Sequence, residues 1–134
     1  MKKLHLQDNV VFTGYVTEDK KAFYYNAAEI FIMPSRELEN GDVEGFGIVF
    51  LEANAYRKPV IGGKSGGVVD AIVDGKTGLL VNPTDAKEIA FAIIRLLGNK
   101  DYATQLGVQG RKRVERDFNW EVIVSRMRIE LEKL

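Results

Sequence analysis

The sequence predicts an α/β fold in which helices cover both faces of a parallel sheet. Short apolar runs alternate with stretches that have the length and pattern of helices, and this alternation is typical of strand, helix, strand units. Hydrophobicity is continuous along each run, which indicates strands buried on both faces. The runs occupy residues 10–12, 30–33, 59–61 and 79–81.

The helices are predicted from capping residues and apolar periodicity. Thr17 is a candidate N-cap for the first helix, and Asp85 and Glu88 have the spacing of a capping box. The expected helices cover residues 18–28, 48–56, 68–73, 85–98, 101–116 and, with Asn119 as cap, 119–133. Right-handed crossovers would bring the carboxyl ends of the strands to one edge of the sheet, where ligands bind in such folds.

Composition narrows the classes of function. The 134 residues carry 19 basic and 19 acidic side chains, so no global field attracts nucleic acid or an anionic membrane. The absence of cysteine excludes disulfides and thiolate catalysis, and with His5 as the only histidine it excludes common metal sites. The first residues lack the apolar run of a signal peptide. We therefore expect a cytoplasmic protein with no metal and no cofactor.

Residues 41–54 organise the chain. A glycine-rich turn leads into the helix at residues 48–56, which is apolar on nearly every side and is expected to be enclosed. Glu52 interrupts this helix and needs a partner, because burying an unpaired carboxylate is costly. Glu44 lies beside the glycines, where the free N–H groups of a helix start can seat a phosphate. With roughly 12 Å of helical rise between the two glutamates, one nucleotide-sugar would reach both.

Three further features have competing interpretations. Residues 62–67 form a second glycine-rich turn, which is either a phosphate loop or a tight connection from strand to helix. Residues 111–113 are basic but are followed by acidic residues, so we interpret them as a solvated helix face. Phe118 and Trp120 are interpreted as packing anchors for the last helix.

Several motifs, in order, resemble retaining glycosyltransferases of the GT-B fold, notably the large family 4. The central one is EGFGIVFLE at residues 44–52, which has that family's signature of two glutamates separated by seven residues. The others are NVVFTGYV at 9–16, AEIFIMPS at 28–35, KPVIG at 58–62, DGKTGLLV at 74–81 and FNWE at 118–121. The resemblance implies a partial C-terminal domain with a Rossmann-like sheet. Residues 1–134 would then be a donor-binding domain, incomplete at its N-terminus.

The resemblance also implies roles for individual residues. Glu44, the implied catalytic residue, would bind hydroxyls of the donor sugar, and Glu52 would hold the ribose hydroxyls. Other donor contacts would come from Gly14, Tyr15 and Val16, whose backbone would face the base, and from Gly45, Phe46, Gly47 and Ile48 around the sugar and diphosphate. At Val69 and Asp70 the family usually has proline and glutamate, which weakens any role for that turn.

The family has parts that are not present in this sequence. An acceptor domain, two strands of the donor domain, and an arginine and a lysine that neutralise the diphosphate would lie before the first motif. We therefore expect an open sheet edge between residues 10–12 and 30–33, so that the isolated chain self-associates, pairs with a complementary fragment or is partly unfolded. We also expect no sugar transfer by the isolated chain. No general base is apparent, which suits the front-face transfer described for the family, in which the leaving phosphate assists.

Three functions stay open from the sequence. The first is the donor-binding part of a hexosyltransferase in polysaccharide, glycolipid or glycoconjugate synthesis, cytoplasmic or peripheral at the membrane in its longer form. The second is a truncated, non-catalytic nucleotide-binding or interaction module. The third is a related GT-B epimerase or phosphorylase.

Overall fold

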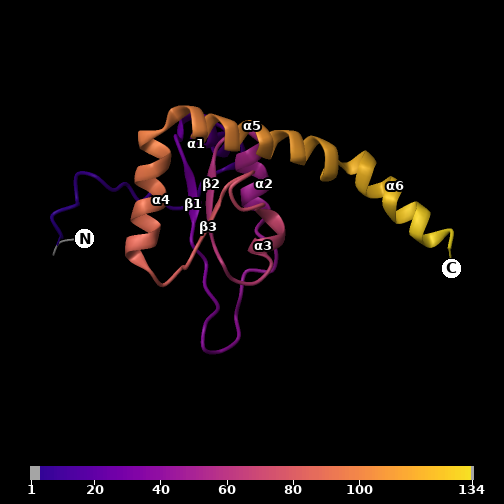
Figure 1. Cartoon of the computed structure of the whole chain (residues 1–134), viewed down its shortest axis with the longest axis horizontal. Helices are drawn as coiled ribbons and strands as arrows, with labels where there is room; N and C mark the ends of the chain where they lie inside the picture. The colour runs from indigo at the N-terminus through magenta and orange to yellow at the C-terminus, as the bar shows by residue number, and fades with distance from the viewer. Residues whose placement is uncertain (1–3, 134) are drawn as a thin grey trace.

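The computed structural model describes residues 4–133 and contains a parallel sheet (Figure 1). The strands are β1 (Phe31–Met33), β2 (Val60–Gly63) and β3 (Leu79–Val81), in the order β1-β2-β3. In the central strand, Ile61 lies opposite Ile32 of β1 and Leu79 of β3. The parallel α/β sheet predicted from the apolar runs is confirmed.

Helices connect and follow these strands at the predicted places. In the described residues they are α1 (Glu18–Ala27), α2 (Ile48–Ala55), α3 (Val68–Ala71), α4 (Ala86–Gly98), α5 (Lys100–Asp117) and α6 (Trp120–Leu131). Their ends lie within two residues of the predicted ends. Asp85 caps α4 by accepting bonds from the N–H groups of Lys87 and Glu88, at 2.8 and 3.1 Å. Thr17 occupies the N-cap of α1, but its side chain makes no capping bond.

β2 is the centre of the core because its side chains alternate between two apolar clusters. Val60 belongs to a cluster with Phe50 of α2 and with residues of α1 and α3. Ile61 belongs to a second cluster with Leu96 of α4 and Leu106 of α5. All five side chains are fully or almost fully buried. Figure 1 shows α4 on one side of the sheet and α2 and α3 on the other, so the sheet is covered on both faces.

The strand predicted at residues 10–12 is wrong. These residues have no regular secondary structure, and Val10, Val11 and Phe12 are 38%, 85% and 79% exposed. An apolar run becomes a strand only where a neighbouring strand pairs with its backbone N–H and C=O groups. Within residues 4–133, β1 pairs with β2 alone, so its other edge is open as expected.

α2 is less enclosed than its composition suggests. Phe50, Ala53 and Asn54 are buried, whereas Ile48 is 67% exposed. The helix packs against β2, α3 and α5, and side chains of α1 reach it at Glu52, but its first residue remains uncovered. The expected enclosure on nearly all sides is therefore wrong for the start of this helix.

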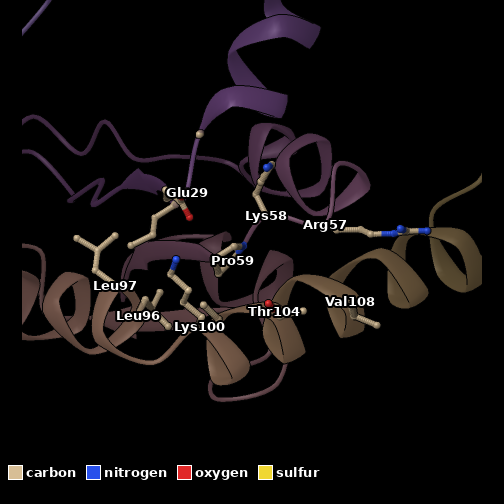
Figure 2. A pocket seen from close by; sticks show the side chains of 12 residues that line it. Glu29, Arg57, Lys58, Pro59, Leu96, Leu97, Lys100, Thr104 and Val108 are labelled. Carbon is tan, nitrogen blue, oxygen red and sulfur yellow. The ribbon is translucent and has the colours of Figure 1, made fainter.

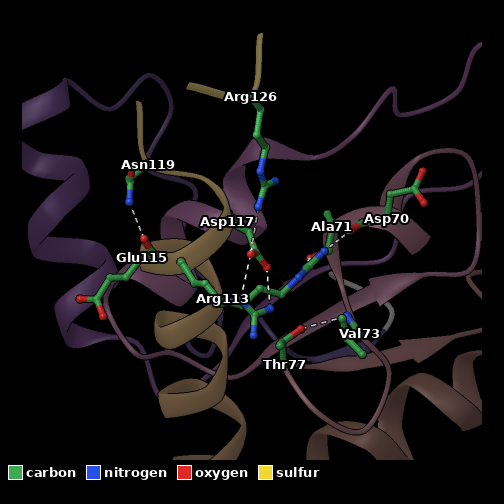
Figure 3. A network of polar contacts seen from close by, with 10 residues as sticks. Asp70, Ala71, Val73, Thr77, Arg113, Glu115, Asp117, Asn119 and Arg126 are labelled. Carbon is green, nitrogen blue, oxygen red and sulfur yellow. Dashed lines mark hydrogen bonds and ion pairs between the residues drawn. The ribbon is translucent and has the colours of Figure 1, made fainter. Parts of the chain in front are cut away.

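Two of the three basic residues at 111–113, Arg111 and Arg113, are structural, which corrects their interpretation as a solvated face, while Lys112 is exposed as expected. Arg111 donates to the carbonyl of Ala55 at the end of α2. Arg113 donates to the carbonyls of Ala71 and, at 2.7 Å, Asp70 at the end of α3 (Figure 3). Guanidinium groups suit these positions because the carboxyl end of a helix is partly negative. Burial lowers the pKa of Arg113.

α6 extends away from the rest of the molecule (Figure 1), and none of its residues is buried. Trp120 is 80% exposed, so its predicted packing role is wrong. Phe118 does act as an anchor. Its ring lies 5.8 Å from that of Phe46, and the Arg113 guanidinium lies 4.9 Å from its centroid.

Candidate functional site

Two glycine-rich segments meet where β1 and β2 end. The Gly67 N–H donates to the carbonyl of Glu44 at 3.1 Å, and a Cβ added at Gly67 would lie 1.8 Å from the carbonyl oxygen of Gly45. Only glycine permits this approach. The contact supports the interpretation of residues 62–67 as a tight connection, because it locks that turn against residues 44–47.

Gly47 sets the start of α2 at this edge. It is the N-cap, with a φ of +82°, and a Cβ there would lie 2.6 Å from the ring of Phe50. A left-handed backbone with no space for a side chain requires glycine. Helix starts leave N–H groups without an intrahelical partner, so the first turn of α2 can receive an anion. Ile48, the first residue of that turn, is exposed.

Glu44 lies half-buried beside this helix start. It lines a cavity of about 530 Å³ together with Ser35, Asp42 and Pro83, at the base of the loop that follows β1. Within residues 4–133 its carboxylate has no hydrogen bond and no ion pair, so the group is free to accept hydrogen bonds from a ligand. Gly45 and Phe46 follow it, and Phe46 turns its ring towards Phe118.

Glu52 has the partners that its position on an apolar helix required. Lys21 Nζ lies 3.0 Å from Oε1, and the Tyr25 hydroxyl donates to Oε2 at 2.8 Å. Lys21 also pairs with Glu18 at 3.0 Å. Hydrogen bonds to Glu18 and Glu52 raise the pKa of Lys21, while burial and the bond to Glu52 raise the pKa of Tyr25. Both donors are therefore protonated at neutral pH.

The two glutamates lie at separate places. Glu44 lines the polar cavity after β1, whereas Glu52 lines an apolar cavity of about 480 Å³ with Phe46, Phe118 and Trp120. Glu44 precedes the N-cap of α2 by three residues, whereas Glu52 is the fifth residue of the helix, so the continuous helical rise expected between them is wrong for residues 44–47. Of these two glutamates, the one on the turn before α2 has a free carboxylate, and the one within α2 has a paired carboxylate.

The residues expected to face the nucleotide base precede α1. Gly14 has a φ of +63°, Tyr15 is 90% exposed, and Val16 is half-buried. Within the described residues, none of the three hydrogen-bonds to residues 41–54. Sequence reasoning missed Lys21 and Tyr25, because they are 31 and 27 residues from Glu52 and no local signal links them to it.

Another cavity, of about 500 Å³, lies at the opposite end of the sheet (Figure 2). Glu29 and Lys58, which precede β1 and β2, line it together with Leu96, Leu97 and Lys100. Lys58 Nζ donates to the carbonyl of Asn26 at 2.9 Å. This cavity is at the amino ends of the strands, so it is separate from the helix start and from Glu44.

The described residues were also compared with the requirements of metal sites and membrane-spanning helices. Residues 4–133 contain no group of three or more histidine, cysteine, aspartate or glutamate side chains that could hold a metal ion. No helix in that range combines the length and the hydropathy needed to cross a bilayer. His5 lies in an exposed turn ahead of α1.

Comparison with known proteins gives consistent relatives. Residues 1–113 match the family model described as glycosyl transferases group 1. A GDP-mannose-dependent alpha-(1-6)-phosphatidylinositol monomannoside mannosyltransferase of Mycobacterium tuberculosis is 40% identical over 121 residues, which are 90% of this chain and 31% of the relative. The chain thus spans about a third of the length of the curated relatives it matches.

Solved structures share the fold. Sucrose-phosphate synthase from Thermosynechococcus elongatus superposes with a TM-score of 0.84 at 37% identity, over 98% of this chain and 32% of that protein. HepE from Anabaena, in complex with UDP and glucose, superposes with a TM-score of 0.85 at 22% identity, over 99% of this chain and 34% of that protein. The C-terminal domain of LpcC, a Francisella tularensis group 1 glycosyl transferase, superposes with a TM-score of 0.76 at 27% identity, over 89% of this chain and 58% of that domain. The fold is that of a GT-B C-terminal domain, and the chain belongs to the group 1 glycosyl transferases.

Proposed function

We propose that this chain is the donor-binding part of a retaining glycosyltransferase, similar to family 4, that moves a hexose from a nucleotide diphosphate sugar to an acceptor. The observation that carries the proposal is the free carboxylate of Glu44 beside a helix start, on a turn locked by Gly67 at the carboxyl ends of parallel strands. Ligands of open α/β sheets bind at this edge. A relative that uses GDP-mannose and a neighbour solved with UDP and glucose support a nucleotide-sugar donor.

The proposed roles divide along α2. Glu44 accepts hydrogen bonds from the hexose, and the backbone at Gly45, Phe46, Gly47 and Ile48 receives the sugar and the diphosphate. Glu52 accepts from the ribose, and Gly14, Tyr15 and Val16 face the base. The family's front-face mechanism, in which the leaving phosphate assists, places no general base in this chain. Glu44 then acts by positioning the sugar and stabilising it as positive charge develops at its anomeric carbon.

The remaining parts of the proposal concern the longer protein. Its N-terminal acceptor domain and the other strands of the donor domain would cover the open edge of β1, and the protein would work in glycolipid, polysaccharide or glycoconjugate synthesis, in the cytoplasm or at the membrane periphery. Alone, the chain should transfer no sugar, because catalysis needs an oriented acceptor. It should also self-associate through β1, which sedimentation velocity would detect.

Calorimetry on two matched variants tests the roles. Glu52→Gln should weaken GDP or UDP, with or without a sugar, by about ten- to a hundredfold, the scale of a lost charge-assisted hydrogen bond. Glu44→Gln should leave the bare nucleotide unchanged. In a chimera with the N-terminal part of the mycobacterial relative, it should lower transfer by about two orders of magnitude. Glu29→Gln, at the opposite end of the sheet, is the control.

Two results would contradict this assignment. If both substitutions weaken bare nucleotide equally, Glu44 does not face the sugar. If the chain binds neither GDP nor UDP, the donor site is wrong. The second candidate is a non-catalytic nucleotide-binding module, because the shared fold and the helix start of α2 would account for nucleotide binding without transfer. That module would bind nucleotide normally, and the chimera would give no turnover.

A further inference from the structure

Two side chains of α1 hold the carboxylate of Glu52 from one side. Lys21 Nζ lies 3.0 Å from Oε1, and the Tyr25 hydroxyl lies 2.8 Å from Oε2. The donors are four residues apart on α1, so they project from the same face, one turn apart. Each carboxylate oxygen has its own donor, and the plane of the group is therefore set by α1.

The two donors are themselves held in place. Tyr25 is buried, and its ring stacks on that of Tyr56 with centroids 5.4 Å apart and lies 5.7 Å from that of Phe31. Lys21 Nζ also forms an ion pair with Glu18 Oε2, at 3.0 Å. A tyrosine packed between two rings has little rotamer freedom to lose. The orientation of Glu52 is consequently fixed before any ligand arrives.

The carboxylate still has capacity for a ligand. An ionised carboxylate has about four lone-pair sites, and Lys21 and Tyr25 use one on each oxygen. The Glu52 side chain is 32% exposed, so a second site on each oxygen can be reached from outside. Two adjacent hydroxyls, such as the 2′ and 3′ hydroxyls of a ribose, present two donors at a spacing suited to a carboxylate.

We propose that Lys21 and Tyr25 are positioning residues, which hold Glu52 so that its free acceptor sites receive the two ribose hydroxyls of the donor. The inference rests on the proposed function, in which Glu52 binds the ribose. In this arrangement Lys21 holds one carboxylate oxygen of Glu52 by an ion pair, and Tyr25 holds the other by a hydrogen bond. Neither side chain touches the nucleotide. Pre-orientation matters because a carboxylate that rotates freely loses entropy when it binds a diol.

The chain supplies matched controls on the same helix. Tyr24 and Lys20 are exposed neighbours of Tyr25 and Lys21, and within the described residues their polar side-chain atoms bond to no carboxylate. The variants are therefore Tyr25→Phe and Lys21→Met, with Tyr24→Phe and Lys20→Met as controls. Each pair removes the same atoms, one residue apart.

Calorimetry on the 134-residue chain would use GDP and UDP, each beside its 2′,3′-dideoxy form. The unmodified chain should bind the ribonucleotide about tenfold more tightly than the dideoxy form, on the energy scale of such hydrogen bonds. Tyr25→Phe and Lys21→Met should remove most of this preference and leave dideoxynucleotide binding unchanged. The two controls should keep the preference. General damage to the fold would weaken both nucleotide forms alike.

A spectroscopic readout tests the contact without any ligand. Glu52 contributes to the raised pKa of Tyr25, so Glu52→Gln should make one tyrosine ionise at lower pH in an ultraviolet titration, and Tyr25→Phe should abolish that difference. The groups facing Tyr25 are Glu52, Lys21, Glu18 and the stacked Tyr56. No change in the titration means that the contact is absent and overturns the proposal. A normal preference for ribose in both variants overturns positioning but leaves the proposed function. No preference in the unmodified chain overturns the role of Glu52 itself.

Discussion

Two apolar runs with the same sequence pattern have opposite fates in this molecule. Residues 31–33 form β1, paired in register with β2, whereas residues 10–12 are exposed and unpaired among the described residues. Both runs contain β-branched and aromatic residues, so β propensity does not explain why only residues 31–33 form a strand. The difference is a neighbour, because β1 has β2 beside it and helices over it.

The same contrast appears between two aromatic side chains. Phe50 of α2 is fully buried, and Trp120 at the start of α6 is 80% exposed. α2 packs against β2, α3 and α5. α6 leaves the body of the molecule, as Figure 1 shows. We refer to residues 10–12 and α6 as the peripheral segments. These segments show that an apolar side chain stabilises the fold only where other parts of the chain pack over it.

The largest expected effect is on the free energy of unfolding, when one phenylalanine is removed from the core and one from the peripheral segments. Phe50→Ala should lower the free energy of unfolding by about 4 kcal/mol, the typical loss for a buried phenylalanine. Phe12→Ala should change it by less than about 0.5 kcal/mol. Urea denaturation measures both. A cost above about 1 kcal/mol for Phe12→Ala would show that residues 10–12 are covered in solution, most simply by a second copy of the chain.

A second comparison uses both sides of one contact. Gly67→Ala should cost about 3 kcal/mol, because its Cβ would lie 1.8 Å from the Gly45 carbonyl oxygen and backbone cannot move aside as a side chain can. Gly45→Ala adds the same methyl group to the other partner, where a Cβ meets nothing within 4 Å, and should be nearly neutral. Urea denaturation again gives the values. If Gly67→Ala lowered the free energy of unfolding as little as Gly45→Ala does, the two turns would not be packed against each other.

The order and type of the elements could be predicted from local signals. Asp85 at the start of α4 and the apolar run at residues 79–81 are readable because capping and burial depend on neighbours in sequence. The failures at residues 10–12 and Trp120 have one cause. Each has a strong local pattern, but its fate depends on which parts of the chain lie beside it in space.

The candidate site shows the same division. The need of Glu52 for a partner could be predicted from its place on an apolar helix. The identity of the partners could not, because Lys21 and Tyr25 are 31 and 27 residues away and meet Glu52 only when α1 docks on α2. The mutual contact of Gly67 with Glu44 and Gly45 was likewise invisible, since composition shows two flexible turns and not their packing.

A third prediction compares two helix caps. Asp85→Ala should cost about 1 kcal/mol of global stability, because α4 contributes buried Ala92 and Leu96 to the core. Asn119→Ala removes an equivalent cap from α6, which buries nothing, so global stability should fall by less than about 0.5 kcal/mol while helicity decreases. Urea denaturation and far-ultraviolet circular dichroism would be measured together. A similar loss of stability in both variants would indicate that α6 is packed.

The smallest expected effect lies at the joint between the core and α6. Asp117 bonds to Arg116 at 2.7 and 2.8 Å and to Arg126 at 3.5 Å, and the bond to Arg116 holds the pKa of Asp117 below its usual value. A lowered pKa means that the ionised form is stabilising at neutral pH, and that this contribution is lost as acid protonates the folded state, below about pH 4. Figure 3 shows Asp117 close to Arg113 and Arg126.

The corresponding variant is Asp117→Asn, with Glu121→Gln on α6 as the control. Asp117→Asn should be slightly less stable than the unmodified chain at about pH 7, and the difference should shrink as acidification protonates Asp117 in the folded state. The gap stays small because the pair is partly exposed and screened by solvent and salt. Urea denaturation across that range at two salt concentrations measures it. A gap that persists in acid would mean that Asp117 acts through packing, and the contrast between the core and α6 would then begin further along the chain.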